Sequence, residues 1–230
     1  MGERWFWMEY KELMEILEQL GTEQNRKIYK RHGAAEPLFG VSYANFKVLK
    51  KKIKKDQELA IKLWESGNTD ARILASMIAN PKAFDENTID AWLKEITYSG
   101  LLDEFVYDIV AKTEYAYKKQ QEWILSEDEW VGRAGWCLVT VFAMDDKIGD
   151  EAYFEEMLKL IELEIQSSAN RKKEGMHNAL LAIGIRSEHL EKKAIKAANR
   201  IGDIVIDYGE TSCKTPDTIA YIKRGRSRKK

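Results

Sequence analysis

Two isolated charges lie inside apolar stretches of this sequence, and charges in such positions often belong to functional sites. Arg133 is the single cation in the apolar run at residues 130–143, and Asp103 lies in a second apolar run, LLDEFV. Burying an unpaired charge is costly, so each side chain must either reach solvent or meet an opposite charge. An isolated acid and an isolated base near the starts of two apolar helices are the strongest functional signal in the chain.

Both charges also have structural explanations. Asp103 can stabilise the dipole of a helix by lying near its N-terminus. Arg133 can form an ion pair within the fold, with Asp103 or Asp128 as its partner. These explanations do not exclude a function, because a binding groove also needs a preorganised pair of charges.

The charge balance limits the partners that the whole chain can attract. The formal net charge is −1 over 230 residues, so any binding of nucleic acid must come from a local basic face. No apolar run is long enough to span a membrane, and the N-terminal sequence MGERWFWMEY lacks the form of a signal peptide. We therefore expect a cytoplasmic protein without membrane contact, and we take it to be a monomer.

The cysteines and histidines do not predict a metal site. Cys137 lies in the apolar run around Arg133, and neither it nor Cys213 has metal-ligand spacing. None of the three histidines has a second ligand at such a spacing, although His177 could face a groove. We expect no metal and no cofactor.

The apolar pattern repeats as pairs of helices joined by short polar breaks. These breaks fall at residues 65–70, 97–100, 126–129 and 166–173. Five tryptophans at helical spacing belong to the predicted core: Trp64, Trp92, Trp123, Trp130 and Trp136. Units of two helices cannot bury their apolar faces alone, so they stack as an α-solenoid. No alternating strand pattern appears, and we predict an all-α fold.

Local signals place the N-terminal elements. The first helix should end at Gly21 and has a stripe of six apolar residues: Trp5, Met8, Leu13, Ile16, Leu17 and Leu20. Residues 33–46 should form a loop that Phe39 and Val41 anchor to the core. Ser42 is a suitable N-cap for the helix that follows.

The C-terminal part differs from the helix pairs. Turn signals at residues 208–209 and 215–216 precede a final short helix through Ile222. The last residues, KRGRSRKK, are basic, and we expect residues 224–230 to form a disordered tail. The remainder, residues 1–223, should form a single domain.

Two basic clusters could meet phosphates. The helix after Ser42 carries six lysines: Lys47, Lys50, Lys51, Lys52, Lys54 and Lys55. They form either a solvated face or a phosphate-facing one, with Lys47 and Lys51 as the candidate DNA contacts. Arg171, Lys172 and Lys173 open the second helix of the fourth pair, where helix N-terminal amides add to the attraction for anions.

Two segments carry a resemblance to a known family: WESGNTDARILASMIANP at residues 64–81 and WILSEDEWVGRAGW at residues 123–136. They resemble the bacterial DNA alkylation repair proteins, whose best-studied members are DNA glycosylases that remove positively charged alkylpurines. The resemblance extends from the GAAEPLFGV loop to the region of Gly184, and it implies a superhelical α-solenoid of HEAT-like helix pairs. The C-terminal sequence YGETSCKTPDTIAYI resembles a subgroup of this family without an assigned function.

The resemblance implies catalytic roles for the two isolated charges. In the glycosylase members an aspartate and an arginine line a concave groove, and Asp103 and Arg133 fall on these positions. An alkylated purine is already cationic, so its glycosidic bond needs little activation. The Asp103 carboxylate would stabilise the developing positive charge on the sugar and orient or deprotonate a water. Arg133 would hold a backbone phosphate next to the lesion.

The sequence departs from this family at two positions where active glycosylases carry tryptophan. One position holds Ser99, with Tyr98 beside it, and the other falls near Ala182, with Leu181 and Ile185 as neighbours. An aromatic wall contributes about 1–3 kcal/mol per stacked group, so these losses weaken the prediction of base excision. Tyr98 could replace one wall only if the helix start is shifted by a residue, and we name Tyr98 and Ser99 as candidate DNA contacts.

Three functional alternatives follow from these residues. The first is an enzyme that binds duplex DNA in a concave basic groove and hydrolyses the N-glycosidic bond of alkylated purines. The second is a DNA-binding module of the same fold without chemistry, and the third is a protein-binding scaffold, which an acidic concave surface would favour. The retained acid and arginine favour the first, and the missing aromatics favour the second. We expect a DNA-alkylation-repair-like protein that binds duplex DNA, with glycosylase activity as an open alternative.

Overall fold

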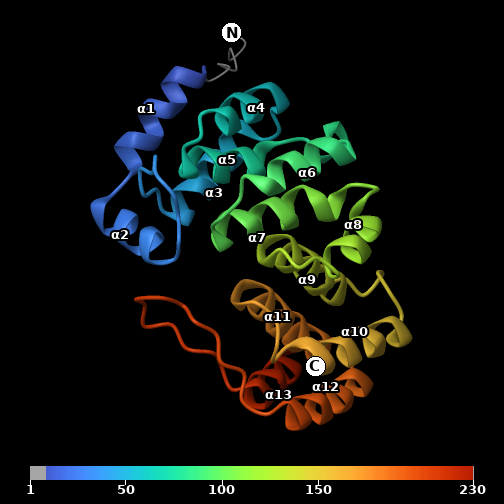
Figure 1. The fold of residues 1–230 in the computed structure, drawn as a ribbon. Helices are drawn as coiled ribbons and strands as arrows, with labels where there is room; N and C mark the ends of the chain where they lie inside the picture. The colour runs from blue at the N-terminus through green and yellow to red at the C-terminus, as the bar shows by residue number, and fades with distance from the viewer. Residues whose placement is uncertain (1–8, 230) are drawn as a thin grey trace. The chain divides into compact units, whose positions relative to one another are not determined.

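The computed structural model describes residues 9–229 of the chain. In this part the regular elements are α-helices and two short 3-10 helices, together with an isolated bridge between Gly21 and Val41 (Figure 1). The prediction of an all-α fold is confirmed. Trp5 and Met8, which belong to the predicted stripe of the first helix, lie outside the described residues. Within those residues, no helix is both long enough and apolar enough to cross a membrane.

The contacts group the chain into two compact units, Met1–Thr113 and Glu114–Lys230, which we describe separately. The single domain over residues 1–223 stays a prediction. In the first unit the elements follow in this order: α1 (Tyr10–Leu20), α2 (Glu23–Arg31), α3 (Tyr43–Ile53), α4 (Gln57–Glu65), α5 (Thr69–Ile78), η1 (Pro81–Ala83), α6 (Glu86–Lys94), α7 (Ser99–Asp108) and η2 (Val110–Lys112). Helix α5 packs against α3, α4 and α7 and lies at the centre of this unit.

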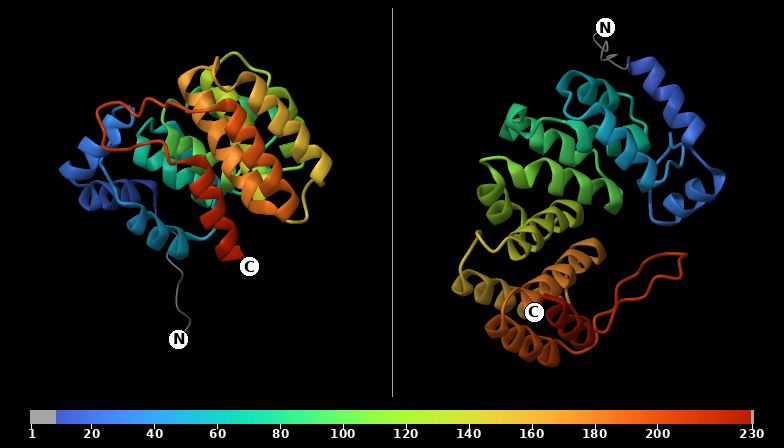
Figure 2. Two further views of the ribbon diagram at one scale, coloured as in Figure 1. Left: turned by 90° about the horizontal axis from the view of Figure 1, so that it is seen from below. Right: turned by 180° about the vertical axis from the view of Figure 1, so that it is seen from behind.

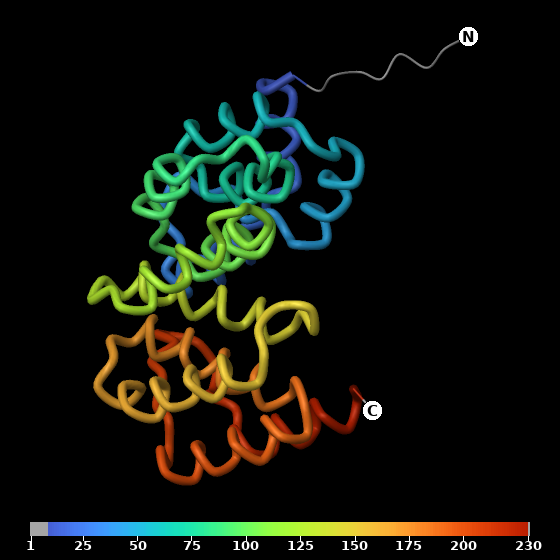
Figure 3. Tube along the Cα trace, turned by 90° about the vertical axis from the view of Figure 1, so that its right-hand side faces the viewer, coloured from blue at the N-terminus to red at the C-terminus, as the bar shows by residue number. Residues whose placement is uncertain are grey.

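The second unit is built around one long helix. Its elements are α8 (Ala116–Trp123), α9 (Glu129–Met144), α10 (Glu151–Glu164), α11 (Asn170–Arg186), α12 (Glu188–Ile201) and α13 (Thr218–Lys229). Helix α11 contacts α9, α10, α12 and α13 (Figure 2, Figure 3). Gly175 allows the close approach of α11 to α9, because a Cβ there would lie 3.1 Å from the Cβ of Trp136.

Aromatic packing confirms most of the predicted core. The rings of Trp64 and Trp92 stack with centroids 3.8 Å apart. Trp123 and Trp136 are also buried. Trp130 differs, because it remains partly exposed at the start of α9.

Polar side chains just before the helices explain where most of them begin. Ser42 caps α3 by accepting a backbone N–H from its first turn at 3.3 Å. Asp128 caps α9 by accepting the N–H groups of Trp130 and Val131, each at 2.9 Å. Such caps satisfy N–H groups that lack a partner inside the helix. Helices α5, α7 and α9 begin within the predicted breaks, and α11 begins within the break predicted at residues 166–173.

A buried carboxylate fixes the loop before α3. In the first turn of α5, Asp70 accepts the backbone N–H groups of Phe39 at 2.6 Å, Gly40 at 3.1 Å and Val41 at 2.7 Å. Leu38 and Val41 are buried whereas Phe39 is partly exposed, so Leu38 takes the anchoring role predicted for Phe39. The loop needs glycine at position 40, where φ is 85° and a Cβ would lie 2.5 Å from a backbone oxygen at the start of α2.

The C-terminal helix extends beyond the end that the sequence predicts. A disordered tail was expected from residue 224, whereas α13 continues through Lys229. Its backbone lies close to α11, since a Cβ on Gly225 would be 2.4 Å from the Ile185 side chain. Arg226 donates a hydrogen bond to the backbone oxygen of Ile185 at 3.1 Å. These contacts order a basic segment that composition alone marks as flexible.

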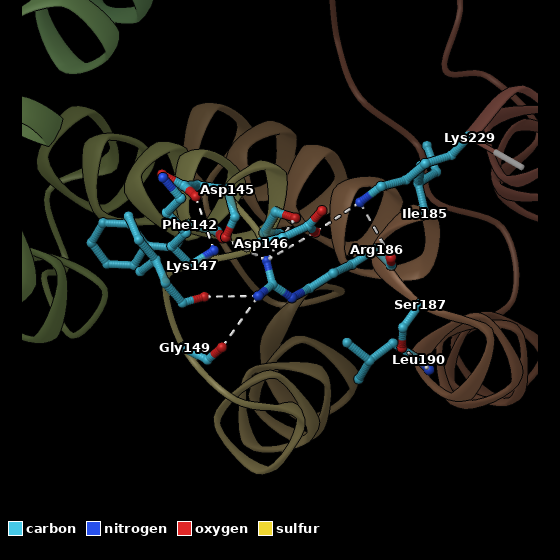
Figure 4. A network of polar contacts seen from close by, with 12 residues as sticks. Phe142, Asp145, Asp146, Lys147, Gly149, Ile185, Arg186, Ser187, Leu190 and Lys229 are labelled. Carbon is cyan, nitrogen blue, oxygen red and sulfur yellow. Dashed lines mark hydrogen bonds and ion pairs between the residues drawn. The ribbon is translucent and has the colours of Figure 1, made fainter.

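One arginine organises the end of α9 and the loop that follows it. Nη1 of Arg186 donates to the backbone oxygens of Phe142, Ala143 and Asp145 at 3.0, 3.2 and 2.7 Å (Figure 4). Nη2 donates to the oxygens of Ile148 and Gly149 at 3.0 and 3.2 Å. The guanidinium also lies over the Phe154 ring, 4.6 Å from its centroid. Arg186 therefore serves as a C-terminal cap for α9 and fixes the start of α10.

Candidate nucleic-acid interface

Asp103 lies on the second turn of α7 and is partly exposed. The first turn of this helix contains no acidic residue, and the helix dipole acts mainly within that turn. The helix-terminal explanation for Asp103 is therefore weak. Its side chain reaches the surface of the first unit, as a functional role requires.

The start of α7 covers a cluster of tyrosines. Tyr98 is 7% exposed, and its ring centroid lies 6.0 Å from that of Tyr29. A Cβ on Gly100 would lie 2.7 Å from the Tyr98 hydroxyl and 2.8 Å from the Tyr43 hydroxyl. Burial, with a contribution from the charge of Asp103, raises the pKa of both Tyr98 and Tyr43. Burial raises the pKa of Tyr29 to about 12.

The two predicted DNA contacts at the start of α7, Tyr98 and Ser99, differ in their exposure to solvent. Helix α7 begins at Ser99, so the shifted start that would turn Tyr98 toward a nucleotide does not occur. Tyr98 packs in the core, and we leave it out of the interface proposed below. Ser99 is partly exposed and offers a hydroxyl in place of an aromatic wall.

The lysines of α3 divide into structural and exposed groups. Lys50 forms an ion pair with the buried carboxylate of Asp108 at 2.6 Å, and Lys112 does the same. Burial opposes the charged form of Asp108, but the two ammonium groups lower its pKa. Lys47 and Lys51 are exposed, and their i, i+4 spacing places them on one face of α3.

A second carboxyl lies next to Asp103. Burial, followed by the like charge of Asp108, raises the pKa of Glu104 to about 7, while Lys50 and Lys47 act in the opposite direction. The predicted residues Asp103 and Lys47 therefore share one neighbourhood with Glu104, which was not among the predicted site residues. A carboxyl that titrates near neutral pH can accept or donate a proton. Glu104 lies in the same LLDEFV run as Asp103, but the sequence alone did not indicate how far it is buried.

In the second unit, Arg133 forms a buried ion pair. Its guanidinium lies 2.9 Å from Oε2 of Glu174 on α11, and its side chain is 3% exposed. Arg171 donates from Nη1 to the same oxygen at 3.1 Å. The sequence suggested Asp103 or Asp128 as the partner of Arg133. Within this unit the carboxylate beside it is Glu174, while Asp128 caps α9.

The neighbours of Arg171 hold it against the start of α9. Its guanidinium carbon lies 5.9 Å from the ring centroid of Trp130, within the range of a cation–π contact. The backbone N–H of Arg171 donates to Glu129 at 3.1 Å. The Arg171 side chain keeps 18% of its surface exposed, so it can still reach an external anion.

The other cations predicted on α11 have different environments. Lys172 is buried, lies against Gly132 and donates to the backbone oxygen of Ser126 at 3.1 Å. It serves the packing of α9 and α11, and we leave it out of the proposed interface. Lys173 is partly exposed, and its ammonium forms no ion pair within the part of the chain that the structure describes.

His177 faces the core and not a groove. Its Nε2 lies 3.0 Å from the Thr218 hydroxyl of α13, and its side chain is buried. Burial lowers the pKa of His177 to about 4, so the ring is neutral at pH 7. Across residues 9–229, no three His, Cys, Asp or Glu side chains gather as a metal site.

The C-terminal loop reaches the Arg133–Glu174 pair. Asn170 and Asp207 exchange two hydrogen bonds of 2.8 Å, which fasten the loop to the start of α11. Burial raises the pKa of Tyr208, to which the nearby charge of Glu174 also contributes. Tyr208 and Glu174 are contacts that the sequence did not reveal, because they depend on how this loop folds back.

The family follows from the extent of the sequence match. Residues 13–212 match the model of a protein family described as DNA alkylation repair enzyme. The chain belongs to this family.

Two curated proteins from Listeria support the relationship over nearly the full length of each chain. Uncharacterized protein Lin0241 of Listeria innocua is 29% identical, over 92% of this chain and 95% of its own. Uncharacterized protein Lmo0209 of Listeria monocytogenes is 28% identical, over 93% and 96% respectively.

A solved structure extends the relationship to the repeat type. It is 32% identical, has a TM-score of 0.87, and the match covers 96% of this chain and 95% of the solved one. It represents a new family of proteins related to the HEAT-like repeat DNA glycosylases, with affinity for branched DNA structures. The prediction of HEAT-like helix pairs is thereby confirmed.

The two positions that depart from the glycosylase members of this family lie in different units. Ser99 opens α7 and Ala182 lies within α11, and both are partly exposed. Neither presents an aromatic ring.

Proposed function

We propose that this protein binds DNA, and branched DNA in preference to a linear duplex. The observation that carries the proposal is the solved relative, whose family has affinity for branched DNA structures and which is 32% identical over 96% of this chain. Membership of the DNA alkylation repair enzyme family supports the same class of partner.

The proposed phosphate contacts are exposed or partly exposed cations on two helices. Lys47 and Lys51 lie on the outer face of α3, and Lys173 lies in the first turn of α11 with Arg171 nearby. Cations of this kind neutralise backbone phosphates without reading sequence. A net charge of −1 means that these local groups, and not the charge of the whole chain, supply the attraction.

The test is a binding titration with a four-way junction and with a linear duplex of the same length. We expect tighter binding to the junction and a steep loss of affinity between about 50 mM and about 200 mM salt. Absent or salt-insensitive binding to both DNAs would overturn the proposal.

A pair of double variants tests the α3 contacts. Lys47→Ala with Lys51→Ala should weaken binding roughly tenfold or more and reduce the salt slope by about 2, because two phosphate contacts are lost. The control is Lys192→Ala with Lys196→Ala, which removes two exposed lysines at the same spacing from α12. An equal loss in the control would mean that net charge, and not the α3 face, determines the affinity.

Base excision is the second candidate, which the partly exposed Asp103 beside Glu104 favours. The Asp103 carboxylate would stabilise positive charge developing on the sugar of an alkylated purine nucleotide. Release of base from methylated duplex DNA, lost in Asp103→Asn, would support it. If the unaltered protein released no base, this candidate would fall and the proposal of DNA binding would stand by itself.

A further inference from the structure

We propose that Glu174 is an internal anion that holds the place of a DNA phosphate between Arg133 and Arg171. The inference rests on the proposed binding of DNA. It adds that Glu174 limits the affinity of the protein for DNA. In this arrangement α11 presents fewer free cations to DNA than its sequence suggests.

The geometry is that of an anion site that is already filled. One oxygen of Glu174 lies 2.9 Å from Nη1 of Arg133 and 3.1 Å from Nη1 of Arg171. Guanidinium groups bind carboxylate and phosphate oxygens through the same N–H donors. The Glu174 carboxylate therefore accepts a hydrogen bond from Arg171 that a phosphate could otherwise accept, and it lies within ion-pair distance of Arg133.

Helix packing brings Arg133 and Arg171 together, and further contacts hold Arg171 in place. Gly175 brings α11 against α9, since a Cβ there would lie 3.2 Å from the backbone oxygen of Arg133. The N–H bond to Glu129 and the contact with Trp130 position Arg171. Arg171 is thus positioned by contacts that do not involve Glu174.

Exposure decides which of the two cations can meet DNA. The Arg133 side chain is 3% exposed and that of Glu174 is 13% exposed, whereas that of Arg171 is 18% exposed. Arg133 is therefore a positioning residue that fixes Glu174. Arg171 is the cation whose charge Glu174 withholds from a phosphate at the surface.

The experiment compares Glu174→Gln with the unaltered protein in the four-way-junction titration. Glutamine keeps an oxygen for the guanidinium groups but removes the charge. One additional phosphate contact steepens the salt slope by about 0.9, which at about 50 mM salt corresponds to roughly tenfold tighter binding. Damage to the fold would weaken binding, so a gain separates this role from a purely structural one.

The matched control is Glu162→Gln on α10. It also removes one negative charge from an ion pair with an arginine, in this case Arg200. The proposal requires that this control leaves the affinity within about twofold, since Arg200 lies outside the proposed phosphate contacts. An equal gain in both variants would overturn it, because net charge alone would then explain the effect.

Combining Glu174→Gln with Arg171→Ala tests which cation is released. The gain should disappear in this double variant, and its persistence would overturn the assignment to Arg171. Glu174→Asn is measured in parallel as a second neutral amide, and urea unfolding identifies which variant is folded. Junction binding by the unaltered protein without a gain in the folded neutral variant would overturn this inference alone. No binding by the unaltered protein would instead overturn the proposed function.

Discussion

The carboxylate of Glu174 on α11 lies 2.9 Å from the guanidinium of Arg133 on α9. Both side chains are largely shielded from water, which strengthens their attraction and raises the cost of leaving one without the other. The pair joins two helices that pack closely along their lengths. The same pair therefore affects both the stability of the second unit and the positive charge that its surface can offer to an anion.

Replacing the two members of this pair together should cost less stability than the two single replacements added together. Glu174→Leu leaves the buried Arg133 without this counter-charge, and we expect a loss of about 3 kcal/mol in the free energy of unfolding. Glu174→Leu combined with Arg133→Met should lose less than the sum of the two single variants, because the double variant leaves neither charge of this pair buried without the other. Urea unfolding of the single and double variants measures this. Strictly additive losses would contradict the prediction.

His177 should make the protein less stable in mild acid. Its pKa is lowered by burial from 6.5 to about 4, so below pH 6.5 the unfolded state binds the proton more readily than the folded state. The contribution of the neutral His177 side chain to the free energy of unfolding is complete above pH 6.5 and is lost as the pH falls toward about 4. At about pH 5 the loss amounts to about 2 kcal/mol.

The measurement for His177 is urea unfolding at pH 7 and about pH 5, with His177→Gln as the comparison. Glutamine can still form a hydrogen bond with Thr218 but does not titrate. We expect the variant to show the smaller decrease in stability between the two pH values. Equal decreases would mean that the ring is not the titrating group.

Glu104 should make the protein less stable as the pH rises, which is the opposite of the effect of His177. The reason is that burial raises the pKa of Glu104 from 4.5 to about 7. The folded state then holds the proton more tightly than the unfolded state. The contribution to stability is complete below pH 4.5 and is lost as the pH rises through about 7. Glu104→Gln should therefore raise the melting temperature at about pH 8 and leave it nearly unchanged at about pH 4.

The control for Glu104 is Glu58→Gln, which neutralises an exposed acid on α4 for which no comparable burial exists. It should show no such dependence on pH. A Glu104→Gln variant whose melting temperature changed equally at both pH values would contradict the assignment.

Replacing Arg186 should lower the free energy of unfolding much more than replacing Arg200. Arg186→Met removes donors to five backbone oxygens at the end of α9 and the start of α10, and we expect a loss of about 3 kcal/mol. Hydrogen exchange should show faster opening of the loop at residues 145–149. Arg200→Met, which removes an exposed ion pair with Glu162, should have little effect on either measurement.

Local sequence was sufficient for where several helices begin, although not for where α13 ends. Ser42 and Asp128 cap α3 and α9 because their own side chains satisfy N–H groups a few residues away. The polar breaks and the apolar spacing likewise predicted paired helices without strands. These features depend on residues that are close in the chain, so neighbours in sequence determine them.

The environments of the candidate site residues depend on contacts between distant segments. Glu174 meets Arg133 across 41 positions of sequence, and Lys50 meets Asp108 across 58. Burial of Tyr98 and the raised pKa of Glu104 arise in the same way, from helices that fold back on one another. A residue type indicates which charge is present, but only packing sets the distance to its partner and its exposure to water, and these two quantities determine whether the charge is free to bind DNA.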